Sequence, residues 1–234
     1  MKIQDRVFVI TGACGGMGQV LCGELARQGA RLAICSRHRD KVEAQCRELE
    51  EKYGAQVMGT ALDVAKEEEV EAFLNEAVRK FGALHALINL AGLSIPGKIE
   101  DTQEDVYDTL MDVNVKGTFL FSKHFARCAQ EDAMIINLGS MAARRTNANA
   151  PLYCMAKAAV NVLSEGLALQ LAEKNIRVTT LNPGGADTPF WGERPVKREK
   201  LLKAEDVVEV MMFVLETDSR VAIRSIDFES RLML

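Results

Sequence analysis

The chain has 234 residues, of which 48% are hydrophobic and 26% charged, and these proportions exclude disordered, collagen-like and coiled-coil proteins. Its 29 Lys and Arg against 33 Asp and Glu give a net charge of -4, which argues against nucleic acid or an anionic membrane as the main partner. The six cysteines form no CxxC pair or Cys/His metal spacing, so we expect free thiols, no bound metal and a cytoplasmic location.

Short apolar runs rich in β-branched residues alternate with longer amphipathic stretches, a pattern typical of a parallel sheet covered by helices on both faces. The runs predict strands at 6–11, 31–35, 56–61, 83–89, 134–138, 176–181 and 221–228. The amphipathic stretches predict helices at 39–53, 66–81, 104–129 and 152–173, with Gly54, Gly82 and Asn175 where helices should stop. No run is long enough to cross a bilayer and no linker divides the chain, so we predict one α/β domain over residues 1–234.

A glycine cluster, Thr11-Gly-Ala-Cys-Gly-Gly-Met-Gly18, joins the first predicted strand to a helix. Glycines at such a junction let the backbone approach a pyrophosphate and direct amide N–H groups and the helix N-terminus at its charge. An ordinary turn is the alternative, but the position after the first strand favours a dinucleotide site. The predicted cofactor contacts in this loop are Gly12, Cys14, Gly15, Gly16, Met17 and Gly18.

The end of the second predicted strand indicates which cofactor binds. An acidic residue there would take the ribose 2'-hydroxyl of NAD, whereas a basic residue would accept the 2'-phosphate of NADP. The segment reads Ile34-Cys-Ser-Arg-His-Arg39 and contains no carboxylate. Ser36 and Arg37 can bind a phosphate, so we predict a preference for NADP, with NAD and a merely solvated Arg37 as the alternatives.

Two further strand ends are expected to contact the cofactor. Asp63 and Val64 follow the third predicted strand, where a carboxylate can accept from the adenine amino group. Asn89, Ala91 and Gly92 end the fourth strand, and small residues there leave room for a ribose. Each segment taken alone is more often a helix cap or a turn.

Four polar residues form the predicted catalytic group. Tyr153 and Lys157 are four positions apart and share a helix face, Ser140 ends a strand thirteen residues before Tyr153, and Asn114 lies on the preceding long helix. A lysine cation at about 5 Å in an effective dielectric of about 20 favours a phenolate by roughly 3 kcal/mol, or about two pKa units. We therefore expect Tyr153 to act as general acid or base, tuned by Lys157. Ser140 would hold the substrate oxygen, and Asn114 would anchor a water that relays protons to Lys157.

With these motifs in order up to Pro183-Gly184, the sequence resembles a short-chain dehydrogenase/reductase over residues 5 to about 190. The resemblance implies a doubly wound Rossmann-type fold with a seven-stranded parallel sheet, and hydride transfer between a nicotinamide and a carbonyl or alcohol. It also implies that Lys157 hydrogen-bonds the nicotinamide ribose and that Pro183, Gly184 and Thr188 contact the nicotinamide.

Some positions depart from the family pattern. Leu90 replaces the usual second Asn, which normally steadies the sheet, and Ala186 replaces a common Ile or Val. Residues 221–230 lack the Gly-Gly pair that many fatty-acid-type ketoacyl reductases carry near the end of the chain. It is similar instead to the branch that includes short-chain 3-hydroxy-acid and serine dehydrogenases.

Residues 185–203 are predicted to form a mobile lid, with Phe190 and Trp191 as apolar surface. A basic rim suggests an anionic substrate, with a solvated loop as the alternative; it comprises Arg144, Arg145, Arg194, Lys197, Arg198, Lys200 and Lys203. Family members commonly form tetramers or dimers through the long helices and the last strand. The apolar residues 211–213 and 232–234 suit that interface or the monomer core. Cys154 is expected to be a packing residue and not a nucleophile.

The combined prediction is an NADP-dependent oxidoreductase of class EC 1.1.1.- that acts on a small carbonyl or secondary alcohol. The alternatives are a dinucleotide-binding sensor without chemistry, an NAD-dependent alcohol dehydrogenase, and an isomerase or epimerase that uses the cofactor transiently.

Overall fold

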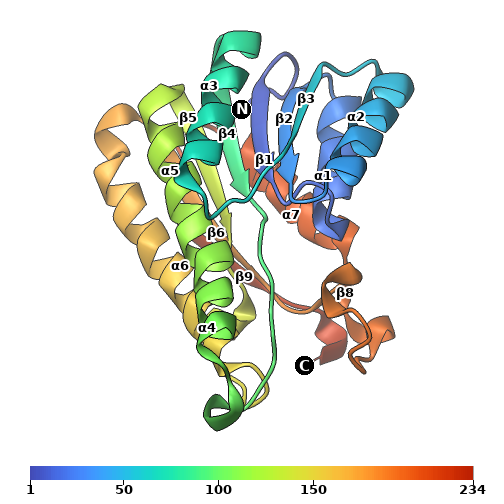
Figure 1. Cartoon of the computed structure of the whole chain (residues 1–234). Helices are drawn as coiled ribbons and strands as arrows, with labels where there is room; N and C mark the ends of the chain where they lie inside the picture. The colour runs from blue at the N-terminus through green and yellow to red at the C-terminus, as the bar shows by residue number, and fades with distance from the viewer. Residues whose placement is uncertain (234) are drawn as a thin grey trace.

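A parallel sheet of seven strands forms the centre of the computed structural model, which describes residues 1–233 (Figure 1). The strands are β1 Val7–Thr11, β2 Arg31–Ser36, β3 Val57–Ala61, β4 Leu84–Asn89, β5 Ala129–Leu138, β6 Arg177–Pro183 and β9 Ser225–Phe228. Their order is β3-β2-β1-β4-β5-β6-β9, and every neighbouring pair is parallel. The central strands are buried on both faces, which explains their continuous apolar sequence and confirms the predicted fold class.

Helices cover both faces of the sheet (Figure 1). One apolar core lies under α1 Gly16–Arg27, α2 Arg39–Tyr53 and α7 Ala204–Glu216. The other lies under α3 Glu67–Phe81, α5 Gly117–Cys128 and α6 Pro151–Gln170, with α4 Glu104–Met111 packed on α6. The predicted stops are confirmed, since Gly54, Gly82 and Asn175 all have positive φ at helix ends.

The predicted helix over 104–129 is not a regular α-helix. A π-helical turn, Asp112–Lys116, separates α4 from α5 and contains Asn114. In this turn Asn114 donates from Nδ2 to the carbonyl of Leu110 at 2.9 Å, and Thr118 donates to the carbonyl of Asn114 at 2.8 Å. A helical stripe of apolar residues does not reveal such a one-residue widening, which is frequent at functional sites.

The segment after β6 forms a small unit of its own. Short parallel strands β7 Ala186–Asp187 and β8 Leu202–Lys203 enclose two 3-10 turns, Pro189–Trp191 and Arg198–Lys200, in the predicted lid region. Met211 and Met212 of α7 belong to the core, whereas Phe213 and residues 232–233 are exposed. Leu234 lies outside the described residues. β9 is shorter than the predicted strand, because residues 221–224 have no strand structure.

Within residues 1–233, α6 has the length and mean hydropathy, 1.2, that a membrane-spanning helix would need. Three of its polar side chains, Lys157, Asn161 and Ser164, are buried, whereas Glu165 and Gln170 are exposed. The helix packs on β5 and β6, as a core helix of a folded domain does.

Candidate active site

The glycine loop closes tightly against the end of β4, where the strand order reverses between β1 and β4. Gly12 has φ +63°, and a Cβ there would lie 2.7 Å from the amide nitrogen of Ala91. Thr11 also holds the start of this loop against the end of β4, because its hydroxyl accepts the N–H groups of Leu90 and Ala91, both at 3.1 Å. A Cβ on Gly18 would lie 2.4 Å from a backbone oxygen of the loop. Glycine is therefore required at both positions.

The N-terminus of α1 fits the diphosphate of a dinucleotide. Gly15 is the cap, no side chain caps the helix, and its first turn holds no acidic residue. The first helical bond runs from Gln19 N–H to Gly15 O at 2.9 Å, so the three amides before Gln19 have no acceptor within the helix. Such an end attracts an anion. Thr188 lies over the loop, since a Cβ on Gly16 would be 2.9 Å from the Thr188 Cβ.

The residues predicted to bind the adenosine half follow the carboxyl ends of β1, β2 and β3, which adjoin in the sheet. Ser36 is half-buried and hydrogen-bonds the Cys14 thiol, whose pKa is raised by burial, and Arg37 is exposed. Asp63 accepts the N–H of Ala65 at 3.0 Å through Oδ1. The Val64 side chain is buried, so that residue can offer only its backbone to a cofactor.

Asn89 lies at the expected strand end, but its side chain turns into the protein. Its Nδ2 donates to Asn137 Oδ1 at 2.8 Å, and Asn137 donates to Ser164 Oγ at 2.8 Å. This buried chain joins β4, β5 and α6, and Asn89 is not among the residues that line the main cavity. Leu90, the departure from the family pattern, instead packs in the apolar core and lines the cavity.

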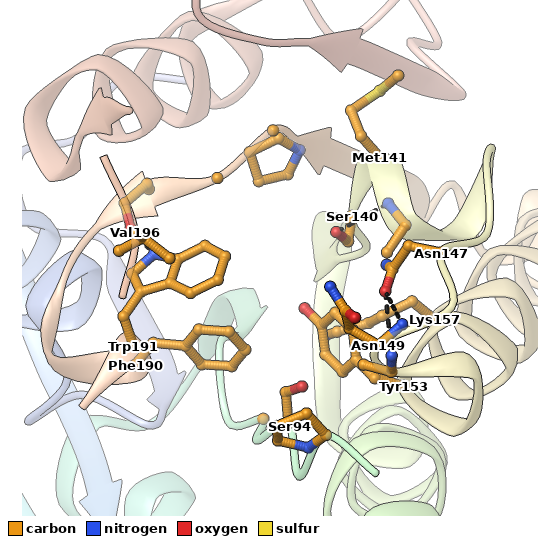
Figure 2. Close-up of a pocket in the computed structure, with 18 of the residues that line it drawn as sticks. Ser94, Ser140, Met141, Asn147, Asn149, Tyr153, Lys157, Phe190, Trp191 and Val196 are labelled. Atoms are coloured by element: carbon orange, nitrogen blue, oxygen red, sulfur yellow. Dashed lines mark hydrogen bonds between the residues drawn. The ribbon is translucent and has the colours of Figure 1, made fainter. Parts of the chain in front are cut away.

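A cavity of about 860 Å³ opens beside the glycine loop (Figure 2). The predicted residues that line it are Met17, Gly92, Ser140, Tyr153, Lys157, Pro183, Gly184 and Thr188. The structure thus brings Ser140, Tyr153 and Lys157 together although they come from the end of β5 and from α6. Helix α6 begins at Pro151, a residue suited to the first helical position, and this start places Tyr153 in its first turn.

The pKa of Tyr153 is raised, where the sequence predicted that Lys157 would lower it. Burial raises the pKa of Tyr153 to about 12, although its hydrogen bond with Ser140 opposes part of this rise. Burial lowers the pKa of Lys157 to about 8. The lysine Nζ donates to the Leu138 carbonyl at 2.7 Å and lies 5.8 Å from the centre of the Tyr153 ring. Dehydration therefore outweighs the expected attraction, and at neutral pH Tyr153 carries a proton that it can donate.

Asn114 lies close to Lys157 across Gly92. A Cβ on Gly92 would be 2.9 Å from Asn114 Oδ1 and 3.4 Å from Lys157 Nζ. The amide of Asn114 is fully buried, and both of its polar ends bond the backbone of Leu93, at 2.9 Å and 3.3 Å. The π-helical turn therefore holds this amide beside the lysine.

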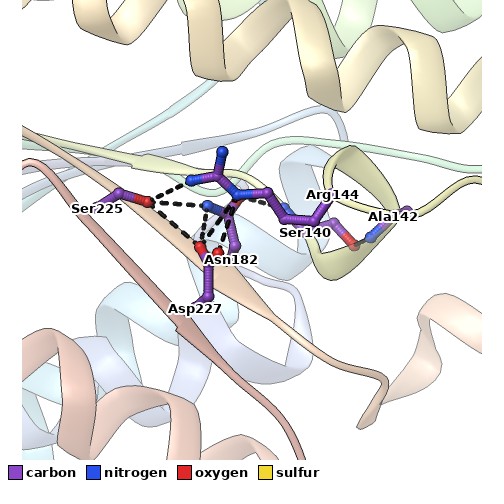
Figure 3. Close-up of polar contacts among 6 residues, drawn as sticks. All are labelled: Ser140, Ala142, Arg144, Asn182, Ser225 and Asp227. Atoms are coloured by element: carbon purple, nitrogen blue, oxygen red, sulfur yellow. Dashed lines mark hydrogen bonds and ion pairs between the residues drawn. The ribbon is translucent and has the colours of Figure 1, made fainter.

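Residues that the sequence did not indicate hold Ser140 in place (Figure 3). The Ser140 N–H donates to Asn182 Oδ1 at 3.0 Å, and the Ser140 hydroxyl accepts the Ala142 N–H at 3.1 Å. Asn182 in turn donates to Asp227 Oδ1 at 2.8 Å, and Arg144 pairs with the same carboxylate at 3.0 Å. The one sequence signal for Asn182 is its place before Pro183-Gly184, and Asp227 had none.

Comparisons with known proteins identify a matching family, similar sequences and similar structures. Residues 6–199 match the profile of the short chain dehydrogenase family. A Staphylococcus aureus protein described as an uncharacterized oxidoreductase is 30% identical over 226 residues, which are 96% of each chain. An alcohol dehydrogenase from the archaeon Thermococcus sibiricus, solved with 5-hydroxy-NADP, has a TM-score of 0.89 and 27% identity over 97% of each chain. A short chain dehydrogenase from Burkholderia cenocepacia, solved with NADP, has a TM-score of 0.88 and 26% identity over 97% of this chain and 98% of that one.

Proposed function

The chain belongs to the short chain dehydrogenase family, and we propose that it is an NADP-dependent oxidoreductase that interconverts a carbonyl compound, an aldehyde or a ketone, and the corresponding primary or secondary alcohol. One observation carries the proposal: Ser140, Tyr153 and Lys157 line one cavity beside the uncapped N-terminus of α1. A diphosphate at that helix end and a carbonyl at the two hydroxyl groups can be accommodated together. A sensor without chemistry has no need of this convergence.

Bound NADPH would supply the hydride, and the chain's own residues would supply position and the proton. The Ser140 hydroxyl holds the substrate oxygen, and the Tyr153 hydroxyl donates a proton to it as negative charge develops. Lys157 would return a proton toward Tyr153, and Asn114 would anchor the water that relays protons to Lys157, since the polar groups of Lys157 and Asn114 adjoin at Gly92. At neutral pH the raised pKa of Tyr153 keeps its hydroxyl protonated, which is the form that proton donation to a carbonyl requires.

The preference for NADP is supported by the end of β2. Ser36 offers a hydroxyl and Arg37 an exposed guanidinium, which binds phosphate through paired N–H groups. Residues 34–39 contain no carboxylate to bind a ribose 2'-hydroxyl. Two structural relatives were solved with NADP or a hydroxylated NADP, which agrees with this choice.

The test compares kcat/KM for NADPH and NADH in the wild type, Arg37→Asp and Arg47→Asp. Arg47 is exposed on α2, so its reversal changes the net charge equally without touching the strand end. We expect the wild type to favour NADPH by at least tenfold, Arg37→Asp to lose most of this preference, and Arg47→Asp to keep it. Equal use of both cofactors by the wild type would refute NADP dependence.

We also propose that the protein forms a homo-oligomer in the cytoplasm. Val162 and Leu169 on α6 are 69% and 73% exposed, and Phe119 on α5 is 44% exposed. Such apolar surface suits burial against a second copy. The six free cysteines suit a reducing compartment. Light scattering of the wild type and of Val162→Glu/Leu169→Glu would measure the association, which the double variant should weaken.

A further inference from the structure

Two aromatic side chains form the lid side of the cavity (Figure 2). Phe190 lies 5.7 Å from Tyr153 between ring centres, and Trp191 packs edge-on against Phe190 at 5.8 Å. The wall faces Ser140 and Met141 across the cavity. A substrate whose oxygen meets Tyr153 therefore places its other groups against these rings.

Hydrogen bonds fix this wall in position. Trp191 Nε1 donates to the carbonyl of Ala186 at 2.8 Å. The guanidinium of Arg194 lies 5.0 Å from each ring centre and donates to the carbonyls of Trp191 and Phe190. Arg194 therefore serves as packing for the two rings. Two of its three nitrogens, Nε and one terminal nitrogen, are thereby engaged by backbone oxygens.

Three of the seven cations in the predicted basic rim, Arg144, Arg145 and Arg198, are paired with carboxylates. Arg145, the other arginine among the described lining residues, pairs with Glu229, whose side chain is only 15% exposed. Outside the cavity, Arg144 pairs with Asp227 and Arg198 with Asp187. Arg145 is therefore held by a carboxylate and is not free to bind an anionic substrate.

Lys197, Lys200 and Lys203 of the predicted basic rim are not among the residues that line the cavity. Lys98 lines the cavity from an exposed loop, where a charge pair contributes little. The buried Lys157 is committed to the Leu138 carbonyl and adjoins Tyr153. The remaining lining is largely apolar or uncharged, including Leu90, Met141 and Val196.

Resting on the proposed function, we propose that the substrate is an uncharged carbonyl compound that bears an aromatic or other bulky apolar group, which packs on Phe190 and Trp191. Glu229 then acts as a specificity residue that keeps Arg145 from binding a carboxylate. The chemistry is that of the proposed reaction: the carbonyl carbon gains hydride from NADPH, and its oxygen gains a proton from Tyr153.

The test uses benzaldehyde and 4-carboxybenzaldehyde, which share a ring and differ in charge, with acetaldehyde as the small probe. We expect the wild type to prefer benzaldehyde over the acid by at least tenfold in kcat/KM. Glu229→Gln frees Arg145, so it should shift this ratio toward the acid by about tenfold. Trp191→Ala should lower the ratio of benzaldehyde to acetaldehyde by about tenfold. Asp218→Asn breaks an exposed ion pair with Arg220 and should alter neither ratio.

The outcomes separate the two proposals. Preference for 4-carboxybenzaldehyde, or ratios unmoved by both Glu229→Gln and Trp191→Ala, would overturn the substrate inference while the reductase activity stands. NADPH binding without reduction of any of the three aldehydes, or of the matching ketones acetophenone, 4-acetylbenzoate and acetone, would overturn the proposed function as well. Thermal unfolding and NADPH titration of each variant show that it is folded and binds cofactor.

Discussion

The backbone N–H of Ser140 donates to the side-chain oxygen of Asn182 at 3.0 Å, so a residue of β6 sets where the loop after β5 begins. The contact is close enough that a Cβ on Gly139 would lie 2.0 Å from the same oxygen. Asn182 is fully buried, and its amide group is turned by bonds to Ser225 and Asp227 of β9. The last strand of the sheet thereby orients the catalytic serine through one amide.

Replacing Asn182 by Ala should reduce kcat by about 10- to 100-fold, because misplacing a reacting group by about 1 Å can cost that much. The KM for NADPH should change little, since Asn182 is not among the residues that line the cavity. Asp227→Asn keeps an acceptor for the amide of Asn182 and should lose less activity. Steady-state kinetics on folded variants would measure both, with Asp218→Asn as the control. A kcat for Asn182→Ala within twofold of wild type would show that Ser140 does not need this bond.

The buried Lys157 should lower the free energy of unfolding of the cofactor-free protein at neutral pH. Its side chain is 3% exposed, and burial lowers its pKa to about 8 from 10.5. Below pH 8 the folded state must hold a dehydrated charge, so its stability should rise as the pH increases from about 8 to 10.5. Lys157→Met should therefore raise the free energy of unfolding at pH 7 by about 1–3 kcal/mol, allowing for the lost bond to Leu138, while abolishing turnover.

Urea unfolding of the cofactor-free wild type and Lys157→Met at pH 7 and pH 10 tests this prediction. The advantage of the variant should shrink at pH 10, because the wild-type lysine is then neutral in the fold. A variant less stable than wild type at pH 7 would show that the ammonium is stabilised by its surroundings.

His85 should make the protein sensitive to mild acid. Burial, with help from Arg6 and Arg31, lowers its pKa to about 4 from 6.5, and its Nδ1 accepts the Val7 N–H at 3.1 Å. As the pH falls from 6.5 to 4, the unfolded chain gains a proton that the folded chain refuses, so stability is lost. His85→Gln keeps an acceptor and should flatten the loss of unfolding free energy over this range. His38→Gln, an exposed histidine, provides the control, and equal slopes in all three proteins would refute the assignment.

The sequence predicted most of the sheet and much of the site because those features are local. The glycine loop, the Tyr153/Lys157 spacing and the stop at Gly54 each depend on a few neighbouring residues. Contacts between distant elements were not readable: Asn182 and Asp227 come from different strands, and their pairing depends on register. The pKa of Tyr153 was misjudged because the sequence shows the charge of Lys157 but not the burial of both groups.

The orientation of the Asn89 side chain also could not be predicted from the sequence. A strand buried on both faces has no polar side, so its sequence does not tell which face receives a given side chain. In the structure the Asn89 amide reaches Asn137 on the next strand. The π-helical turn at Asn114 was missed for a related reason, since one extra residue leaves the apolar stripe nearly unchanged.

Turnover and NADPH binding by Tyr153→Phe test the central claim most directly. The substitution removes the hydroxyl and keeps the ring that packs on Phe190, so the fold and the cavity wall should persist. We predict that NADPH oxidation with benzaldehyde falls by about 100- to 10,000-fold, while NADPH binds with nearly wild-type affinity. Turnover within a few fold of wild type would show that Tyr153 is not the proton donor and would contradict the account.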